Sequence, residues 1–419
     1  SLNAMLKDMQ EILDARARAY NCSFSIALKS TLLNGGNVHV LSAGGASRAT
    51  KFAWGSITKM WTGASIMQLI ARGVLSLNEP AAPYIDEQLA KMKTISFPGM
   101  EGFGTLADLY GEAVNNVTLH NLLAMQSGIP DFDTANPSRS GPDLDPFRAT
   151  VYSKPKMDFL EPLLMAEPWV ALHKLTSTPG EGFHYSSTNF GLLGLVLAHH
   201  AGVTDIRLFN QSFFLPPSLS HVREEIDWAL TGSPVDHGVV AGYDRTDYNG
   251  QDPKKNPAGI DVGRVHGVFA GFTASDFVGT TSAVAELGHA LWGSSSLLLP
   301  KAYRDLMVPK LHSHDFRTSF YGLASQNVGL MGITGGTGEY AIAYGHLGAT
   351  YGYDSILAYN PKLDLAIAVA SNIETPDQLQ PSDTFCRVFN RAKNFMIGEA
   401  VQKCTFVQSG YYGGTCTCK

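Results

Sequence analysis

One segment of this 419-residue chain constrains its fold more than any other. Residues 56–71 read SITKMWTGASIMQLIA, and Lys59 is the single charged side chain among them. A helix without a polar face belongs in the interior of a protein, so the segment predicts a central helix surrounded by other elements. A hydrophobic content of 44% supplies enough apolar material for such a core without a disulfide or metal staple.

The same segment carries two residues that can do chemistry together. Ser56 and Lys59 are three positions apart, so they lie on one face of a helix about one turn apart. A serine hydroxyl is a weak nucleophile that needs a base, and a lysine whose charged form is disfavoured by an apolar environment can be that base. Because Gly55 would let the helix begin at Ser56, the backbone N–H of Ser56 is expected to be an oxyanion donor. The alternative interpretation is a capping serine with a lysine that reaches solvent from the helix end.

Charge and motif content exclude several other classes. Lys plus Arg number 31 and Asp plus Glu number 37, so a net charge of −6 gives no basic field for nucleic acid. The sequence has no apolar run of the ~18–20 residues that a membrane span needs. Residues 336–341 formally match a dinucleotide fingerprint but lie among turn residues, and His312 and His314 lack nearby carboxylates. We therefore expect no cofactor, no metal and no membrane span.

Strand-like patterns stand at both ends of the chain, and mostly helical patterns lie between them. This order predicts an α+β fold in which a helical region is inserted into a sheet domain. We expect the sheet domain at 1–55 and 262–400, the helical region at 56–261 and a cysteine-containing tail at 401–419. Expected helices are 6–20, 118–125, 189–201, 283–291 and 384–396, the last capped by Ser382-Asp383; expected strands include 23–29, 38–41 and 363–370; 131–148 is expected to be an exposed loop.

The five cysteines suggest where the protein works. Cys22, Cys404, Cys416 and Cys418 flank the chain and are expected to form two disulfides that hold the tail, leaving Cys386 as a small buried hydrophobic residue. The alternative is five reduced thiols in the cytosol. The disulfide interpretation makes the protein secreted or periplasmic, with a signal peptide already removed.

Three ordered motifs resemble one family. The segments Trp54–Met60 with Gln68–Pro80, Pro179–Gly194 and Gly345–Tyr353 are similar to the three motif regions of the serine β-lactamase-like, penicillin-binding-protein-like family. That family contains class C β-lactamases, D-alanyl-D-alanine carboxypeptidases, D-aminopeptidases and related esterases. The resemblance runs from about residue 17 to 397 and implies the β-lactamase/transpeptidase-like fold, an antiparallel sheet flanked by helices.

The resemblance also implies roles for individual residues. Ser56 would be the acylated nucleophile and Lys59 its proton partner. Tyr185 would share the base role, kept partly ionised by the lysine cation, and would later activate water. His346 would hold the substrate side and tune Tyr185. The oxyanion donors would be the backbone N–H groups of Ser56 and Ala349, and the substrate-binding positions would be Ser187, Gly348 and Thr350.

Two departures from the family pattern shape the expected activity. The second motif reads Tyr185-Ser186-Ser187 where the family has Tyr-x-Asn, and no Lys-Thr-Gly occurs, so a titratable His346 stands in place of a fixed cation. We therefore expect a serine hydrolase that forms an acyl-enzyme on a small ester or amide, of esterase or acyl-transfer type. A D-amino-acid-specific peptidase or carboxypeptidase comes second, and a weak β-lactamase third. A catalytically weak binding protein that retains the fold is the alternative from another class. Specificity is expected to come from the loops 131–148 and 244–265.

Overall fold

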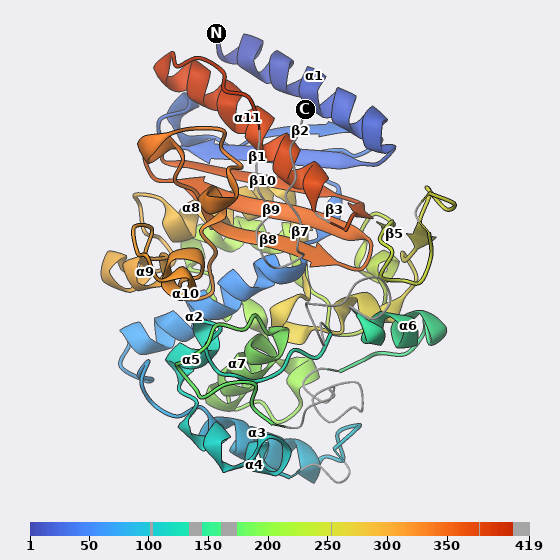
Figure 1. The fold of residues 1–419 in the computed structure, drawn as a ribbon, viewed down its shortest axis with the longest axis vertical. Coiled ribbons are helices and arrows are strands. Elements are labelled where there is room, and N and C mark those ends of the chain that lie inside the picture. The colour runs from blue at the N-terminus through green and yellow to red at the C-terminus, as the bar shows by residue number, and fades with distance from the viewer. Residues whose placement is uncertain (101–103, 134–144, 161–173, 253, 377, 405–419) are drawn as a thin grey trace.

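The computed structural model describes residues 1–100, 104–133, 145–160, 174–252, 254–376 and 378–404 (Figure 1). Its helices are α1 (Leu2–Tyr20), α2 (Thr58–Ala71), α3 (Ala82–Thr94), α4 (Leu106–Tyr110), α5 (Leu119–Leu123), α6 (Pro146–Ser153), α7 (Ser187–His200), α8 (Thr281–Trp292), α9 (Lys301–Met307), α10 (Phe316–Phe320) and α11 (Leu379–Ile397). Its strands are β1 (Phe24–Ser30), β2 (His39–Ala43), β3 (Lys51–Ala53), β4 (Ile226–Trp228), β5 (Tyr243–Asp244), β6 (Ile260–Asp261), β7 (Phe277–Thr280), β8 (Tyr344–Thr350), β9 (Tyr353–Asn360), β10 (Leu365–Ser371) and β11 (Ile373–Glu374).

A five-stranded antiparallel sheet joins the two ends of the chain. Its order is β2-β1-β10-β9-β8, and β1 pairs with β10 so that Phe24 lies opposite Ser371. Every residue of β9 and β10 is buried, which explains why residues 365–370 are apolar without alternation. The expected α+β class and the antiparallel sheet are both confirmed.

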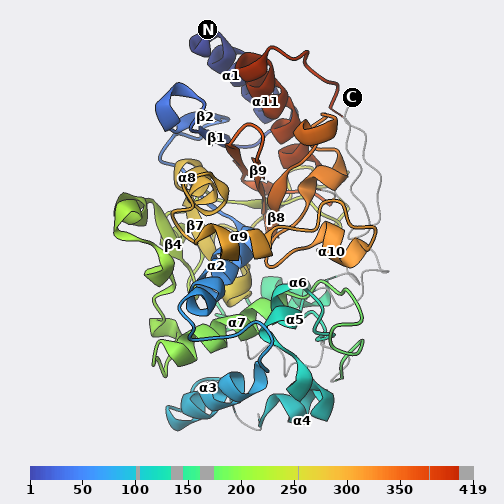
Figure 2. The same ribbon diagram turned by 90° about the vertical axis from the view of Figure 1, so that its left-hand side faces the viewer.

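Helices cover both faces of this sheet (Figures 1 and 2). Helices α1 and α11 lie side by side on one face, and α8 packs against β1, β9 and β10 on the other. An ion pair of 3.1 Å between Arg16 and Asp383 joins α1 to α11. Two further sheets have three short strands each, in the orders β3-β7-β4 and β11-β5-β6.

Helix α2 is the central helix that its composition predicts. It lies between the main sheet and the helices α5 and α7 (Figure 1), and its residues from Thr58 to Met67 are all buried. Close packing requires Gly63, because a Cβ there would lie 2.3 Å from the Cβ of Ala324. A 3₁₀ turn at Gly55–Ile57 precedes the helix and carries Ser56.

Two secondary-structure expectations are wrong. The last helix begins at Leu379 rather than Thr384, because Pro381 is compatible with a first helical turn. Asp383 is therefore no cap; its carboxylate pairs with Arg387 one turn later and with Arg16. The expected exposed loop 131–148 is buried at both described ends, where Asp131 and Arg148 are 3% and 4% exposed.

The expected disulfide pattern is also wrong. Cys386 is bonded to Cys404, with the two Cα atoms 5.7 Å apart, and Cys22 is a buried free thiol. The chain turns at Gly398, which has a positive φ of 73°, and returns along α11, so Cys404 meets the buried face that carries Cys386. Cys416 and Cys418 lie outside the described residues.

Among the described residues, no helix has both the length and the apolar character to cross a bilayer.

Candidate active site

A close contact between strand β8 and the 3₁₀ turn places Ser56. Gly55 has φ 52°, and a Cβ on it would lie 2.4 Å from the carbonyl oxygen of Ala349. A Cβ on Gly348 would likewise lie 2.2 Å from the carbonyl oxygen of Trp54. The two glycines thus allow the backbones to touch. As a result Ser56 and Ala349 line the same cleft, where their amides are expected to act as oxyanion donors.

The structure brings Ser56 and Lys59 into direct contact. The Nζ of Lys59 donates to Ser56 Oγ over 2.8 Å and to the carbonyl oxygen of Ala274 over 3.1 Å. The lysine side chain is completely buried, which rules out the interpretation of a lysine that reaches solvent. Burial lowers the pKa of Lys59 to about 8, against the opposing fields of Asp131 and Asp133. A substantial fraction of the amine is therefore neutral near pH 8 and able to accept the serine proton.

Tyr185 lies over the same ammonium group. The Nζ of Lys59 is 5.1 Å from the centroid of the Tyr185 ring, and the phenol makes a hydrogen bond with Ser56. Burial raises the pKa of Tyr185 well above its usual value, and the hydrogen bond with Ser56 only partly opposes this. Burial and repulsion from Tyr321 therefore favour the neutral phenol over the partly ionised tyrosine that the family resemblance implies. Tyr185 is a neutral phenol that can donate a proton.

His346 packs against Tyr185 and is not among the described residues that line the cleft. Its ring is fully buried and is 6.1 Å from the Tyr185 ring, centroid to centroid. Its Nδ1–H donates to the carbonyl oxygen of Leu347, so Nε2 accepts from the hydroxyl of Tyr321 over 3.1 Å. Burial and the nearby Lys59 lower the pKa of His346 to about 3. The histidine is therefore neutral near pH 7 and supplies no cation for a substrate carboxylate.

The three expected substrate-binding positions differ in how they meet the cleft. Ser187 begins helix α7 and lines the cleft, and its amide donates to Asp131 Oδ1 over 2.9 Å. Thr350 also lines the cleft, but its hydroxyl donates to the carbonyl oxygen of Val268. Gly348 is buried against Trp54.

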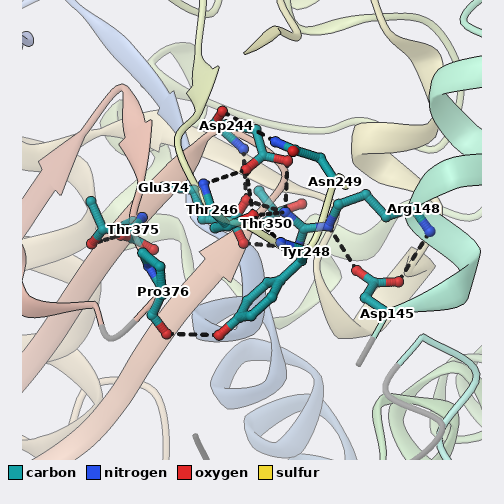
Figure 3. Close-up of polar contacts among 12 residues, drawn as sticks. Asp145, Arg148, Asp244, Thr246, Tyr248, Asn249, Thr350, Glu374, Thr375 and Pro376 are labelled. Carbon is teal, nitrogen blue, oxygen red and sulfur yellow. Dashed lines mark hydrogen bonds and ion pairs between the residues drawn. The ribbon is translucent and has the colours of Figure 1, made fainter. Parts of the chain in front are cut away.

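The cleft that Ser56 lines also holds a buried charge cluster centred on Arg148 (Figure 3). Arg148 makes ion pairs with Asp145, Asp244 and Glu374 over 2.8–2.9 Å. Its guanidinium lies 4.4 Å from the centroid of the Tyr351 ring. We call this group of four ion-paired residues the arginine cluster.

Three carboxylates share one guanidinium in the arginine cluster, so they compete for it. The pKa of Arg148 is raised well above its usual value, because the carboxylates outweigh the cost of burial. Burial raises the pKa of Asp145 to about 6 and that of Glu374 to about 7, although Arg148 opposes both shifts. Arg148 therefore stays protonated, whereas Asp145 and Glu374 are more easily protonated than ordinary carboxylates.

The cleft therefore combines a nucleophile with a polar, mainly acidic wall. Sequence reasoning did not identify Asp131, Asp133 or the arginine cluster as parts of the site. Asp145 and Arg148 lay in the segment expected to be exposed, and Arg148 and Glu374 are 226 residues apart. The sequence pointed to this part of the chain only through the loops 131–148 and 244–265, which are expected to determine specificity. The described lining residues are Ser56, Phe132, Asp133, Asp145, Phe147, Arg148, Ser187, Tyr248, Gly267, Val268, Ala270, Gly271, Ser275, Ala349, Thr350, Tyr351 and Glu374.

The described residues contain no group of three or more His, Cys, Asp or Glu side chains arranged to hold a metal ion. His312 and His314 belong to no such group.

The sheet, the buried Ser-x-x-Lys helix and the crossing strand β8 define the β-lactamase/transpeptidase-like class of fold. The chain belongs to the Beta-lactamase family, whose model matches residues 31–385. The β-lactamase-like resemblance of its three motifs is thereby confirmed.

Individual relatives are distant. The protein flp of Staphylococcus aureus strain N315 is 23% identical over 330 residues, which is 79% of this chain and 54% of flp. The chain thus spans about half the length of the curated relatives it matches.

Solved structures show the same fold over almost the whole chain. A D-stereospecific amidohydrolase from Streptomyces sp. has a TM-score of 0.65 and 19% identity, with 94% of this chain and 98% of that chain covered. The D-amino acid amidase from Ochrobactrum anthropi SV3, complexed with D-phenylalanine, has a TM-score of 0.66 and 19% identity, with 93% and 99% covered. The octameric penicillin-binding protein homologue from Pyrococcus abyssi has a TM-score of 0.60 and 19% identity, with 94% and 78% covered.

Proposed function

We propose that this protein is a serine hydrolase that acts through a covalent acyl-enzyme on a small ester or amide. The observation that carries the proposal is the 2.8 Å contact between the buried Lys59 Nζ and Ser56 Oγ. Membership of the Beta-lactamase family supports it. Burial lowers the pKa of Lys59 to about 8, so part of the lysine is a neutral amine near that pH. A neutral amine next to a serine hydroxyl is the pairing that nucleophilic catalysis needs.

The geometry suggests a division of labour. Neutral Lys59 takes the proton of Ser56 as Oγ attacks the substrate carbonyl, and the amides of Ser56 and Ala349 stabilise the oxyanion. Tyr185, a neutral phenol hydrogen-bonded to Ser56, passes a proton to the leaving group and recovers it from Lys59. Water then cleaves the acyl-serine ester, with the same groups running in reverse. His346 serves to orient Tyr185 through ring packing and through Tyr321.

Two substrate classes fit this site. Ester hydrolysis or acyl transfer fits because an ester has a good leaving group. Its reaction therefore depends little on the asparagine of the family's Tyr-x-Asn motif, which is absent here. A D-amino-acid amide is the second candidate, because carboxylates of Asp133, Asp145 and Glu374 line the cleft and suit a substrate ammonium. A β-lactam is the weakest candidate, since neutral His346 offers no cation to its carboxylate. In all cases we expect a small-molecule substrate, and we expect the protein to be secreted or periplasmic.

Labelling of the serine tests the proposal. The folded protein is incubated with a fluorophosphonate, with p-nitrophenyl acetate and with nitrocefin, and intact mass is measured. We expect a fluorophosphonate adduct on Ser56 that is absent from Ser56→Ala. The matched control is Ser65→Ala, which removes another buried serine of α2 whose hydroxyl donates only to the carbonyl oxygen of Trp61 among the contacts described.

The outcomes separate the hypotheses. Labelling of wild type and Ser65→Ala, but not Ser56→Ala, supports the hydrolase. A folded wild-type protein that no probe modifies at Ser56 would leave the catalytically weak binding protein as the better interpretation. Turnover of D-alaninamide that exceeds that of its N-acetyl form would favour the ammonium-bearing substrate.

A further inference from the structure

Lys59 is a buried cation that needs a counterion whenever it is protonated. An isolated ammonium in a protein interior is costly, and the side chain donates to a hydroxyl and a carbonyl, neither of which is charged. Tyr185 and His346 also face it, but one is a neutral phenol and the other a neutral imidazole near pH 7. Tyr321, behind these two rings, is a neutral phenol as well. The compensating charge must come from elsewhere.

Asp131, on a different segment of the chain, is a carboxyl group whose field acts on Lys59 and opposes the lowering of its pKa. It is 3% exposed, and its Oδ1 accepts the amide of Ser187 over 2.9 Å at the first residue of α7. A helix N-terminus favours a carboxylate by its free N–H groups and its dipole. The segment that carries Asp131 thus meets the helix that follows Tyr185.

Asp133 completes the arrangement. It makes a side-chain hydrogen bond with Asp131, and it lines the cleft together with Ser56 and Ser187. Two carboxyl groups at hydrogen-bond distance hold one proton between them, because both cannot be ionised side by side. Burial and the neighbouring Asp133 raise the pKa of Asp131 well above its usual value, in accord with a shared proton.

We propose that Asp131 and Asp133 act as one unit with a single negative charge and serve as the counterion of Lys59 during acylation. We call the two residues the aspartate pair. The inference rests on the proposed function, because it assigns the pair to the proton transfer between Ser56 and Lys59. Both members are positioning residues: they act through Lys59 and give its ammonium a partner when it receives the serine proton.

The aspartate pair predicts a specific pattern among variants. In Asp131→Asn, Asp133 remains as an anion, and the asparagine oxygen still accepts the Ser187 amide. In Asp133→Asn, the repulsion is gone and Asp131 ionises beside Lys59. Each single variant therefore keeps one negative charge, and only the double variant Asp131→Asn/Asp133→Asn removes it. A merely structural role would give effects that add.

The test follows the protonation of Lys59 in two ways. The first is the pH dependence of fluorophosphonate labelling at Ser56. The second is a lysine-selective ¹³C NMR titration of the folded protein, in which Lys59→Ala identifies the Lys59 signal. We expect the apparent pKa of Lys59 to fall from about 8 by about 1 unit or more in the double variant, and by less than about half a unit in either single variant. Labelling should extend to lower pH in step with this fall.

The matched control is Asp364→Asn. Asp364 is also a buried carboxylate, but its described partners are Thr31, His289, Tyr359 and Ser294, away from the cleft. We expect the Lys59 titration to be unchanged in this variant.

The two proposals fail in different ways. A wild-type protein that is folded but unlabelled at Ser56 overturns the hydrolase, while the NMR titration still decides the role of the pair. A double variant with an unshifted Lys59 pKa overturns the pair, as do single variants whose shifts add up to that of the double.

Discussion

The two sides of the cleft each bury one cation, and they treat it in opposite ways. Arg148 donates to Asp145, Asp244, Thr246 and Glu374, and its pKa is raised. Lys59 donates only to uncharged oxygens among its described contacts, and its pKa is lowered. A guanidinium surrounded by carboxylates does not give up its proton. The poorly paired ammonium is the one whose proton can move.

This difference separates a structural charge from a chemical one. The arginine cluster joins α6 to β5 and β11, and Glu374 also accepts the amide of Gly352, in the turn between β8 and β9. It thereby fixes the far wall of the cleft relative to the strand that carries Ala349. Burial lowers the pKa of Lys59, which lacks a charged hydrogen-bond partner among its described contacts. A shifted pKa is expected of a catalytic group. If this distinction holds, loss of Lys59 should affect turnover and loss of Arg148 should affect stability.

The largest expected effect is on turnover at the lysine side. Replacing Lys59 by Met keeps the volume and removes the base, so turnover of p-nitrophenyl acetate should fall about 10³-fold or more. The thermal midpoint should stay within a few degrees, because removal of a buried cation also removes its desolvation cost, and the aspartate pair can take up a proton. Initial rates and a calorimetric scan measure both quantities.

The control for this prediction is Lys393→Met. Lys393 is another buried lysine, with a side chain 1% exposed, but it lies on α11 and pairs with Glu399. Its loss should leave turnover unchanged. If both variants lose turnover equally, the special position of Lys59 is refuted.

Much of the fold could be predicted because the hydrophobic pattern of each segment indicates whether that segment is buried. The stretch 56–71 lacks a polar face and so belongs in the interior. The apolar run 365–370 needs a sheet with both faces covered. Boundaries were less accurate: Ser382-Asp383 suggested a helix start several residues after the real one. The helix already begins at Leu379, because its first turn tolerates Pro381. The disulfide was wrong because pairing depends on where the chain returns after Gly398, which no local signal encodes.

In the candidate site, too, the residues that a local pattern indicates were predicted, and those that depend on distant segments were not. Ser56 and Lys59 follow from helical spacing, and their contact is what that spacing predicts. Tyr185, His346 and Ala349 came from the resemblance to a family, and their catalytic roles stay predictions. The arginine cluster and the aspartate pair escaped prediction because polar residues in a Pro- and Ser-rich segment indicate an exposed loop. Their burial depends on partners from distant segments.

The second prediction concerns the arginine side. Replacing Arg148 by Met leaves three buried carboxylates without their cation, so unfolding free energy should fall by about 3–5 kcal/mol. Urea unfolding followed by circular dichroism measures this loss. Arg207→Met is the control, because Arg207 is 42% exposed and pairs with Asp205 at the surface, and it should cost less than about 1 kcal/mol. Equal losses in both variants would contradict a structural role specific to Arg148.

The third prediction concerns the proton relay. Tyr185→Phe keeps the ring over Lys59 and removes the hydroxyl, so turnover should slow by about 10²-fold while the fold is retained. A Tyr321→Phe variant loses only the hydrogen bond to His346 and should slow turnover less. Steady-state rates on p-nitrophenyl acetate compare them. A near-normal rate for Tyr185→Phe would remove the phenol from the mechanism.

The smallest effect is a pH dependence of stability at Glu374. Burial, with repulsion from Asp244, raises its pKa from 4.5 to about 7 against the pull of Arg148. The folded protein therefore binds more protons than the unfolded chain between these values, and Glu374 contributes stability that is lost as pH rises through that window. Glu374→Gln does not titrate. The stability of wild type relative to Glu374→Gln should fall between about pH 4.5 and 7, by at most about 3 kcal/mol.

Asp364 provides a control of opposite sign. Burial raises its pKa, but hydrogen bonds from His289, Thr31 and Tyr359 outweigh burial and hold the pKa below its usual value. Wild type should therefore lose stability relative to Asp364→Asn as pH falls below about 4, and not as it rises toward 7. Urea titrations at several pH values distinguish the two variants. If Glu374→Gln follows the same course as Asp364→Asn, Arg148 neutralises Glu374 fully, and the competition among three carboxylates for one guanidinium is ruled out.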